Sequence, residues 1–159
     1  MKGVIASRLK QKRFSSHEQE IFIGLVMAAA RVSEPWEQFL KANADLTTNQ
    51  YNVLRILRGS HPEMRTCSEI GDRMIARDPD ITRLIDRMEK RGLVKRSRST
   101  EDRRVVEVGI TSKGLDLVNE LDAHALRMPK ALLGHLGLKR SKQLRDLLEI
   151  VLADLGTFP

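Results

Sequence analysis

Residues 78–111 read DPDITRLIDRMEKRGLVKRSRSTEDRRVVEVGIT, and this stretch decides the fold. Its first part predicts a helix over residues 79–91. The apolar residues there recur at the i, i+3, i+4 and i+7 spacing of one buried helical face: Ile81, Leu84, Ile85 and Met88. Asp78 is the expected N-cap and Pro79 fits the first helical position. Gly92 is expected to end the helix.

Two short strands are predicted to follow this helix, at Leu93–Arg98 and Val105–Ile110. In the second strand Val106, Val108 and Ile110 alternate onto one face. The loop between the strands is strongly charged. A helix with an exposed basic face, followed by a basic hairpin, is suited to gripping a duplex. The stretch therefore predicts a winged helix that binds DNA.

The side of the helix opposite its apolar stripe carries the side chains expected to face DNA. Arg83, Asp86 and Lys90 lie there, flanked by Asp80 and Thr82. In the major groove Arg83 can donate two hydrogen bonds to guanine, Asp80 can accept from cytosine, and Thr82 can touch a thymine methyl group. Phosphates are the expected partners of three more arginines: Arg73, Arg77 and Arg87. The alternative is a solvated face with i, i+4 pairs such as Asp86–Lys90.

Three arginines crowd the predicted wing loop: Arg98, Arg103 and Arg104. Arginine fits a narrow minor groove because the electrostatic potential there is strongly negative. We interpret the neighbouring Asp102 as an anchor within the loop, which aims one guanidinium group through a charge-assisted contact.

The helix over residues 79–91 is the expected recognition helix. Two helices are predicted to precede it, each with a capping box at its start. In the first, Thr47 is the expected N-cap and Gln50 its partner; in the second, Thr66 and Glu69 have these roles. The segment Ile75–Asp78 is the expected turn into the recognition helix. This order of elements predicts a helix-turn-helix.

A long amphipathic helix is predicted before these, beginning near Ser15 or Ser16. Pro35 interrupts its pattern, so we expect the helix to kink there or to restart from Ser33. Residues 1–14 are expected to form a flexible basic tail.

After the wing, Thr111 is expected to cap a helix that ends at Pro129, followed by a short helical piece at Ala131–Leu136. A last helix is predicted at about Ser141–Leu155. Its apolar residues fall on one face: Leu144, Leu147, Leu148, Val151, Leu152 and Leu155.

The composition favours a globular protein with a polyanionic partner. Of 159 residues, 41% are hydrophobic, and the formal net charge is +7. A basic protein without such a partner is the alternative. The apolar part of the N-terminus is too short for a signal peptide, and the longest uncharged run, Ile21–Ala30, is too short to cross a bilayer. We therefore expect a cytoplasmic protein with no membrane contact.

Nothing in the sequence favours an enzyme. Cys67 is the one cysteine, which excludes an intramolecular disulfide, and no histidine lies near it in the sequence. The histidines show no close-spaced ligand pattern: His17, His61, His124 and His135. There is no glycine-rich phosphate loop, so we expect no catalytic residues, cofactor or metal. A redox-sensing Cys67 and a zinc site of histidines and carboxylates are the alternatives.

Four segments together resemble the MarR family of winged-helix transcriptional regulators. They are LTTNQY at 46–51, SEIGDRM at 68–74, ITRLIDRMEKRGLV at 81–94 and DRRVVEVGITSKG at 102–114. The most specific part is the wing pattern of aspartate, any residue, arginine, five residues, aliphatic, threonine. It falls on Asp102, Arg104, Ile110 and Thr111.

The resemblance implies a mainly α fold with a small β-hairpin wing, in which residues 15–159 form one domain. Residues 15–45 and 112–158 would be dimerisation helices, and residues 46–111 the winged-helix lobe. By the same resemblance Arg104 would enter the minor groove, oriented by Asp102. The matching recognition helix carries Asp80, Thr82, Arg83 and Arg87.

The resemblance also implies a homodimer that binds a palindromic DNA operator, most simply as a repressor, and that a small aromatic or amphipathic effector releases. Trp36, Tyr51 and His124 are candidate lining residues for the effector, with ordinary packing as the alternative for each. A different class of protein, an interaction or nonspecific architectural module, would leave the apolar faces of the outer helices uncovered.

Overall fold

The computed structural model describes residues 3–11, 13–76, 78–99 and 102–154. The chain divides into two compact units, residues 1–118 and 119–159, and each is described by itself. The elements of the first unit are α1 (Val4–Arg8), α2 (His17–Ala44), α3 (Thr48–Ser60), β1 (Arg65–Thr66), α4 (Cys67–Asp72), α5 (Ile81–Lys90), β2 (Val94–Arg98) and β3 (Val106–Ile110). Helix α6 (Ser112–Leu133) begins in the first unit and ends in the second, which also holds a 3-10 turn, η1 (Gly134–Leu136), and α7 (Gly137–Asp154).

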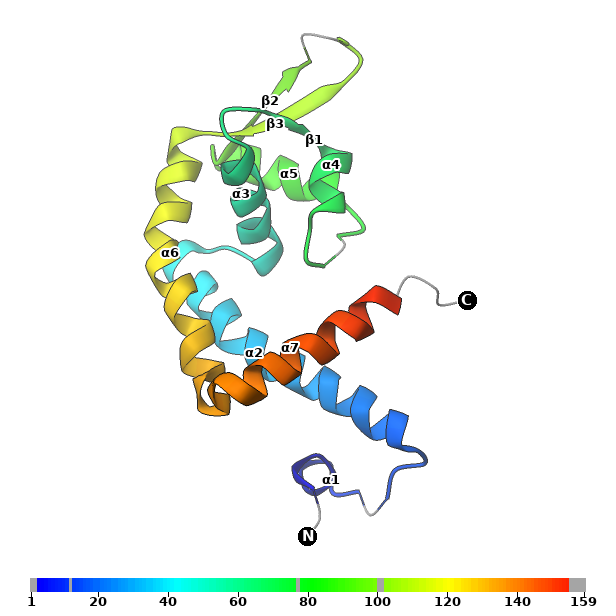
Figure 1. Cartoon of the computed structure of the whole chain (residues 1–159). Helices are drawn as coiled ribbons and strands as arrows, with labels where there is room; N and C mark the ends of the chain where they lie inside the picture. The colour runs from blue at the N-terminus through cyan, green and yellow to red at the C-terminus, as the bar shows by residue number, and fades with distance from the viewer. Residues whose placement is uncertain (1–2, 12, 77, 100–101, 155–159) are drawn as a thin grey trace. The chain divides into compact units, whose positions relative to one another are not determined.

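The fold expected from the sequence is confirmed as a winged helix. Helices α3, α4 and α5 lie beside a small antiparallel sheet, and the β2–β3 hairpin extends away from them (Figure 1). The strand order is β1-β3-β2, with Val94 opposite Ile110 and Arg98 opposite Val106. Strand β1 was not predicted; it is only two residues long and pairs with β3, with Arg65 opposite Val108.

Both predicted capping boxes are present. The Thr47 hydroxyl accepts from the Gln50 amide at the start of α3, and the Gln50 side chain accepts from the Thr47 amide in return. Thr66 and Glu69 make the same reciprocal pair at the start of α4. The hydrogen bond from the Thr66 backbone holds the pKa of Glu69 below its ordinary value. The start of α2 is also as predicted, with Ser16 as the N-cap.

The core of the first unit is aliphatic and is built where helices, strands and connecting segments meet. The predicted stripe of α5 supplies Leu84, Ile85 and Met88, all buried, whereas Ile81 is half-buried. Other fully buried side chains come from the surrounding segments: Leu40, Leu46, Val53, Leu54, Leu57, Ile70, Leu93, Val94, Val108 and Val118. This core fixes α5 with its other side toward solvent.

The backbone after α5 passes close to the backbone at the start of α6, where the second wing strand ends. The Thr111 hydroxyl donates to the Gly92 carbonyl (2.7 Å) and accepts from the Gly114 amide (3.1 Å), which confirms Thr111 as the cap of α6. The Thr111 amide also donates to the Leu93 carbonyl (3.1 Å). A Cβ on Gly114 would lie 2.2 Å from that carbonyl oxygen, so only glycine fits there.

Several predicted helix boundaries are wrong. Helix α2 runs through Pro35, so the restart from Ser33, one of the two expected outcomes there, is wrong. Helix α6 continues past Pro129, and α7 begins at Gly137 rather than Ser141. Proline removes one helical hydrogen bond, and the neighbouring turns of these long helices tolerate the loss.

The expected tail contains a short helix, α1, whose Ile5 side chain lies against Gly24 of α2. Leu155, predicted for the apolar face of the last helix, is outside the described residues. Among the helices of the described part, none is long and apolar enough to cross a membrane.

Candidate nucleic-acid interface

Helix α5 presents a continuous polar face on the winged-helix lobe. Thr82, Arg83, Arg87 and Lys90 are exposed, on the side away from the buried apolar stripe. The helix ends as predicted at Gly92, whose φ of 71° is left-handed. The Gly92 and Leu93 amides donate back to the carbonyls of Glu89 and Met88. The lobe therefore carries a short, firmly ended helix with three exposed cations.

The N-cap of α5 is Asp80, not Asp78 as the sequence predicted. The Asp80 carboxylate accepts from the Arg83 amide (3.1 Å), and its other oxygen lies 3.0 Å from Arg83 Nε. The helix begins two residues later than expected because Pro79 lies in the preceding turn rather than in the first turn of the helix. Asp80 and Arg83, both predicted to contact bases, are thus paired with each other in the free protein.

Asp78 instead shapes the turn that leads into α5. Its carboxylate accepts from the Asp80 amide (3.0 Å) and from the Asn49 side chain of α3 (2.9 Å). The hydrogen bond from Asn49, followed by that from Asp80, holds the pKa of Asp78 below its ordinary value. Asn52 of α3 accepts from the Ile75 amide (2.8 Å) in the same turn. Helix α3 therefore fixes where α5 begins, a role that the sequence did not reveal.

Arg96, in β2, joins the wing to α5. Its guanidinium group contacts the Asp86 carboxylate and donates to Glu89 (3.2 Å) and to the Thr82 carbonyl (3.2 Å). Burial acts to lower the pKa of Arg96, but the hydrogen bond and charge of Asp86 and the charge of Glu89 outweigh it and raise the pKa. Asp86 pairs with Arg96, and the Asp86–Lys90 pair of the alternative interpretation is not observed in the described residues. Sequence reasoning missed Arg96.

The other end of α5 is tied to α2. The Arg91 guanidinium group donates to the Asp45 carbonyl (2.6 Å) and the Ala44 carbonyl (2.8 Å), which end α2. These carbonyls have no partner within α2 itself. Arg91, at the C-terminal end of α5, thus provides hydrogen-bond donors for carbonyl groups at the C-terminal end of α2.

The wing narrows to a tight turn in which Asp102 has a structural part. The Ser99 amide donates to the Val105 carbonyl (2.9 Å), and the Val105 amide donates to the Asp102 carbonyl (2.9 Å). The Asp102 carboxylate accepts from the backbone amide of Arg104 (2.9 Å). Asp102 therefore anchors the loop through the backbone of Arg104, and the predicted contact with a guanidinium group is not observed in the part of the chain that the structure describes.

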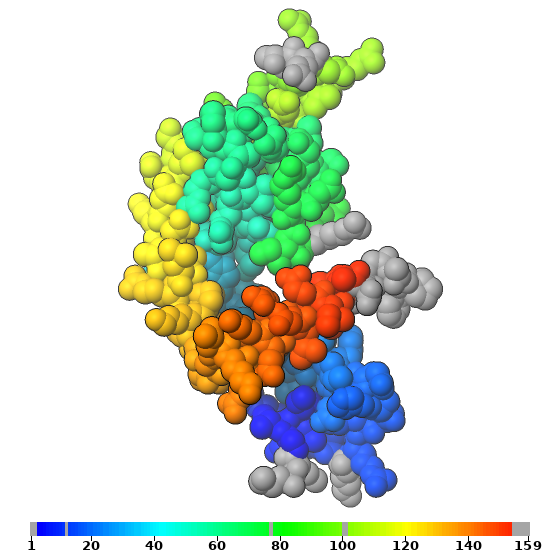
Figure 2. Space-filling model, in the orientation of Figure 1, coloured from blue at the N-terminus to red at the C-terminus, as the bar shows by residue number. Residues whose placement is uncertain are grey.

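The arginines of the wing are exposed. The segment that carries them projects from the body of the lobe (Figure 2). Arg103 and Arg104 lie in the turn, whereas Arg98 is the last residue of β2, not a loop residue. Of the predicted phosphate contacts, Arg87 is exposed on α5, and Arg73 ends α4 and donates to the Glu69 carbonyl (2.7 Å). Arg77 lies outside the described residues.

Of the candidate effector residues, Trp36 and Tyr51 belong to the first unit and His124 to the second. Trp36 stacks on Phe39 with ring centroids 5.5 Å apart and meets Tyr51 edge-on at 4.8 Å, so both Trp36 and Tyr51 belong to the buried core. His124 is exposed on α6 in the second unit.

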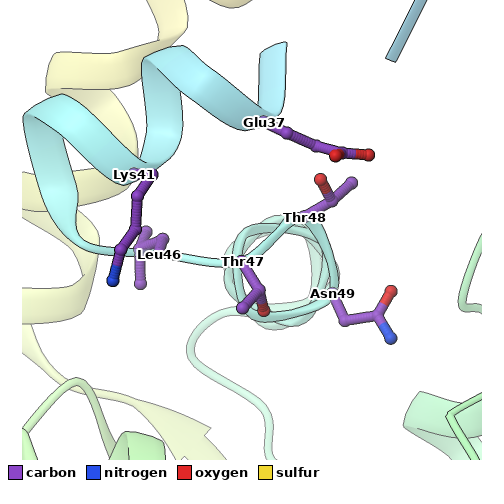
Figure 3. Close-up of a pocket in the computed structure, with 6 residues that line it drawn as sticks. All are labelled: Glu37, Lys41, Leu46, Thr47, Thr48 and Asn49. Carbon is purple, nitrogen blue, oxygen red and sulfur yellow. The ribbon is translucent and has the colours of Figure 1, made fainter. Parts of the chain in front are cut away.

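A separate hollow of about 380 Å³ lies between α2 and the start of α3 (Figure 3). In it the Glu37 side chain extends from α2 toward Thr48 of α3. Its lining residues are Glu37, Lys41, Leu46, Thr47, Thr48 and Asn49.

Comparison with known proteins places this chain among transcriptional regulators. A model of the MarR family matches residues 46–106. The chain is 34% identical over 138 residues to the uncharacterized HTH-type transcriptional regulator YfiV of Bacillus subtilis, covering 86% of this chain and 78% of that protein. It is 30% identical over 136 residues to the HTH-type transcriptional repressor IacR of Pseudomonas putida, covering 86% and 80%.

Solved structures agree with this result. A MarR transcription factor from Planctomyces limnophilus is 40% identical with a TM-score of 0.64, covering 87% of this chain and 99% of that chain. MepR of S. aureus, in a complex with DNA, is 22% identical with a TM-score of 0.74, covering 81% and 93%. PcaV of Streptomyces coelicolor, in complex with its natural ligand, is 21% identical with a TM-score of 0.69, covering 98% and 99%. The last two matches concern the fold alone.

Proposed function

Because the chain belongs to the MarR family of transcriptional regulators, we propose that it binds a palindromic DNA operator as a homodimer and represses the adjacent promoter. The observation that carries this proposal is the pairing of an exposed basic helix face with an arginine-tipped wing on one lobe. An α-helix fits the major groove, and arginine fits a narrow minor groove. A dimer bound across a promoter represses by occupying it.

The dimer is proposed from the apolar surface that a single chain leaves in water. Phe22 and Val26 on α2 are 65% and 54% exposed, and Leu147 and Leu152 on α7 are 62% and 65% exposed. Monomeric proteins rarely expose large apolar patches, and a twofold axis buries the same patch of both copies at once. Residues 15–45 and 112–158 are the proposed dimerisation segments, with residues 46–111 as the DNA-binding lobe.

Each copy of α5 is proposed to enter the major groove of one half-site. Arg83 is the proposed contact to a guanine, with Thr82 and Asp80 beside it, and Arg73, Arg77, Arg87 and Arg98 are proposed to bind phosphates. Asp80 holds Arg83 in the free protein, so contact with guanine requires the guanidinium group to leave or share that partner.

The effector is a further part of the proposal. PcaV is described with a natural ligand, and the hollow between α2 and α3 offers this chain a place for a small molecule with polar groups. Trp36 and Tyr51 are buried in the core. We propose that they have a packing role and do not contact the ligand.

We expect the protein to protect a palindrome in its own promoter region, with half-sites about one helical turn apart. The logarithm of the affinity should fall steeply with the logarithm of the salt concentration, because several lysines and arginines displace counterions from DNA. Footprinting and a salt titration by fluorescence anisotropy measure both. A nearly flat salt response, or equal affinity for a scrambled duplex, would contradict the proposal.

The wing allows a sharper prediction about two neighbouring arginines. Arg104→Ala should weaken operator binding by about 1.5–3 kcal/mol, the range for a hydrogen bond to a charged group. Arg103→Ala should weaken it much less, because Arg104 is the arginine that matches the family's wing pattern and whose backbone amide is held by Asp102. Both variants should keep the wild-type melting temperature, since both side chains are exposed in a turn. Operator binding and thermal melts check the pair.

Asp102 gives the control that separates geometry from charge. Removing an acid should tighten DNA binding if the wing is only a basic patch. We expect Asp102→Ala to weaken binding instead, because the Arg104 amide loses its acceptor. Asp102→Asn keeps an acceptor oxygen and should bind nearly as well as the wild type. Tighter binding by Asp102→Ala at physiological salt would rule out this role.

A further inference from the structure

Arg96 makes a link between strand and helix that the proposed function does not by itself require. Its side chain crosses from β2 to α5 and contacts the Asp86 carboxylate, the Glu89 carboxylate and the Thr82 carbonyl. Its backbone amide also donates to Glu89 Oε1 (3.0 Å). The Arg96 side chain is 25% exposed, whereas those of Asp86 and Glu89 are 43% and 39% exposed. The link therefore lies at the edge of the surface that the lobe offers to DNA.

The three partners of Arg96 lie on one stripe of α5. Residues 82, 86 and 89 are spaced i, i+4 and i+7, so they share one side of the helix, and the contacts show that this side faces β2. Arg83 and Arg87 each directly follow a member of this stripe, and both are exposed. Arg96 therefore contacts α5 on a second side, in addition to the buried core, while Arg83 and Arg87 face outward.

The chemistry of Arg96 suits this task better than that of lysine. A planar guanidinium group with five N–H donors can engage two carboxylates and a carbonyl together, whereas an ammonium group is a single point charge. The contact also reduces an electrostatic repulsion. Asp86 and Glu89 are negatively charged, and in the proposed complex their helix approaches the negatively charged phosphates of DNA. Arg96 compensates their charge and keeps Asp86 directed toward the wing.

We propose that Arg96 is a positioning residue that locks α5 and the wing into one unit, so that major-groove and minor-groove contacts are made in a fixed register. The inference rests on the proposed function and deepens it. It assigns part of the sequence discrimination to a residue that need not touch a base. It also places Asp86 outside the set of base-reading residues.

The test compares two variants that lose the same charge from the same strand. Arg96→Gln breaks the link, and Lys95→Gln removes an exposed neighbouring cation. Each is titrated with the operator duplex and with a scrambled duplex, well below its melting temperature. Arg96→Gln should lower the ratio of the two affinities by about tenfold, within the range of measured coupling energies. Lys95→Gln should weaken both duplexes by a similar factor and leave the ratio unchanged.

Two further variants separate position from charge. The double variant Arg96→Gln/Asp86→Asn has the net charge of the wild type, so its discrimination recovers if Arg96 acts only by neutralising Asp86. We expect it to stay low. Arg96→Lys keeps the charge and should recover only part of the discrimination; it also replaces Arg96→Gln if that variant does not fold.

Hydrogen exchange of the DNA-free protein gives a readout that needs no operator. Exchange of the α5 amides should be faster in Arg96→Gln than in the wild type and unchanged in Lys95→Gln. A wild type that does not prefer the operator refutes the proposed function together with this inference. A wild type that does prefer it, with an unchanged ratio in Arg96→Gln, refutes the role of Arg96 alone. Recovery in the charge-neutral double variant would likewise overturn positioning.

Discussion

Gly114→Ala, where the winged-helix lobe meets α6, is expected to be the most damaging single substitution, costing about 3 kcal/mol or more, the upper end for overpacking. The added Cβ would lie 2.2 Å from the Leu93 carbonyl oxygen and 2.8 Å from Ile110 Cγ1. That carbonyl cannot easily move, because it accepts from the Thr111 amide between the wing and α6. Thermal or denaturant unfolding, followed by circular dichroism, measures the loss.

Gly59 provides the matched control within the same lobe. It lies in α3, and a Cβ there would meet nothing within 4 Å. Gly59→Ala should therefore be neutral or stabilising by up to about 1 kcal/mol, because alanine favours the helix and reduces the freedom of the unfolded chain. Equal melting temperatures for the two variants would contradict the close approach at Gly114.

The second large effect is expected at the proposed dimer interface. Leu148→Asp/Leu152→Asp places two charges on the apolar face of α7, where burial of unpaired carboxylates is costly. The wild type should have twice the chain mass of 18.1 kDa in light scattering at micromolar concentration, and the variant should be monomeric or unfolded. Operator affinity should fall steeply, because each lobe then binds its half-site without the other.

Ala153→Asp is the control for this variant. Ala153 is exposed near the end of α7, and at 100° per residue it lies opposite the leucine stripe. It introduces an acid on the same helix and should leave the dimer intact. A wild-type chain that is a stable monomer with a cooperative melt would rule out the dimer altogether.

The parts of the fold that the sequence predicted are those fixed by local chemistry. Each capping box predicts a helix start from four consecutive residues: Thr47 to Gln50 for α3 and Thr66 to Glu69 for α4. The apolar stripe of α5 follows from the spacing of its apolar residues alone. The start of α5 was misplaced because two aspartates flank Pro79. Only the distant Asn49 makes the first of them, Asp78, a turn residue and leaves the cap to Asp80.

The residues of the candidate site were likewise predicted only where local sequence patterns determine their exposure. The exposure of Arg83 and Arg87 follows from helical periodicity, and that of Arg104 from its place in the charged loop between two predicted strands. Arg96 could not be found in this way, because its partners lie 7 to 14 residues away across a helix end and a strand. No spacing rule connects such groups. The contact exists only once the hairpin folds back beside α5.

The bond between Arg91 and the end of α2 has a mechanical consequence for regulation. It pins the last turn of a 28-residue helix to the last turn of the recognition helix. In the proposed dimer we expect α2 and α5 to move together, because Arg91 joins their C-terminal ends. A tilt of α2 at its N-terminal end would then move α5. A molecule that tilts α2 can change the distance between the two recognition helices, and with it their fit to the operator, without touching any residue that meets DNA.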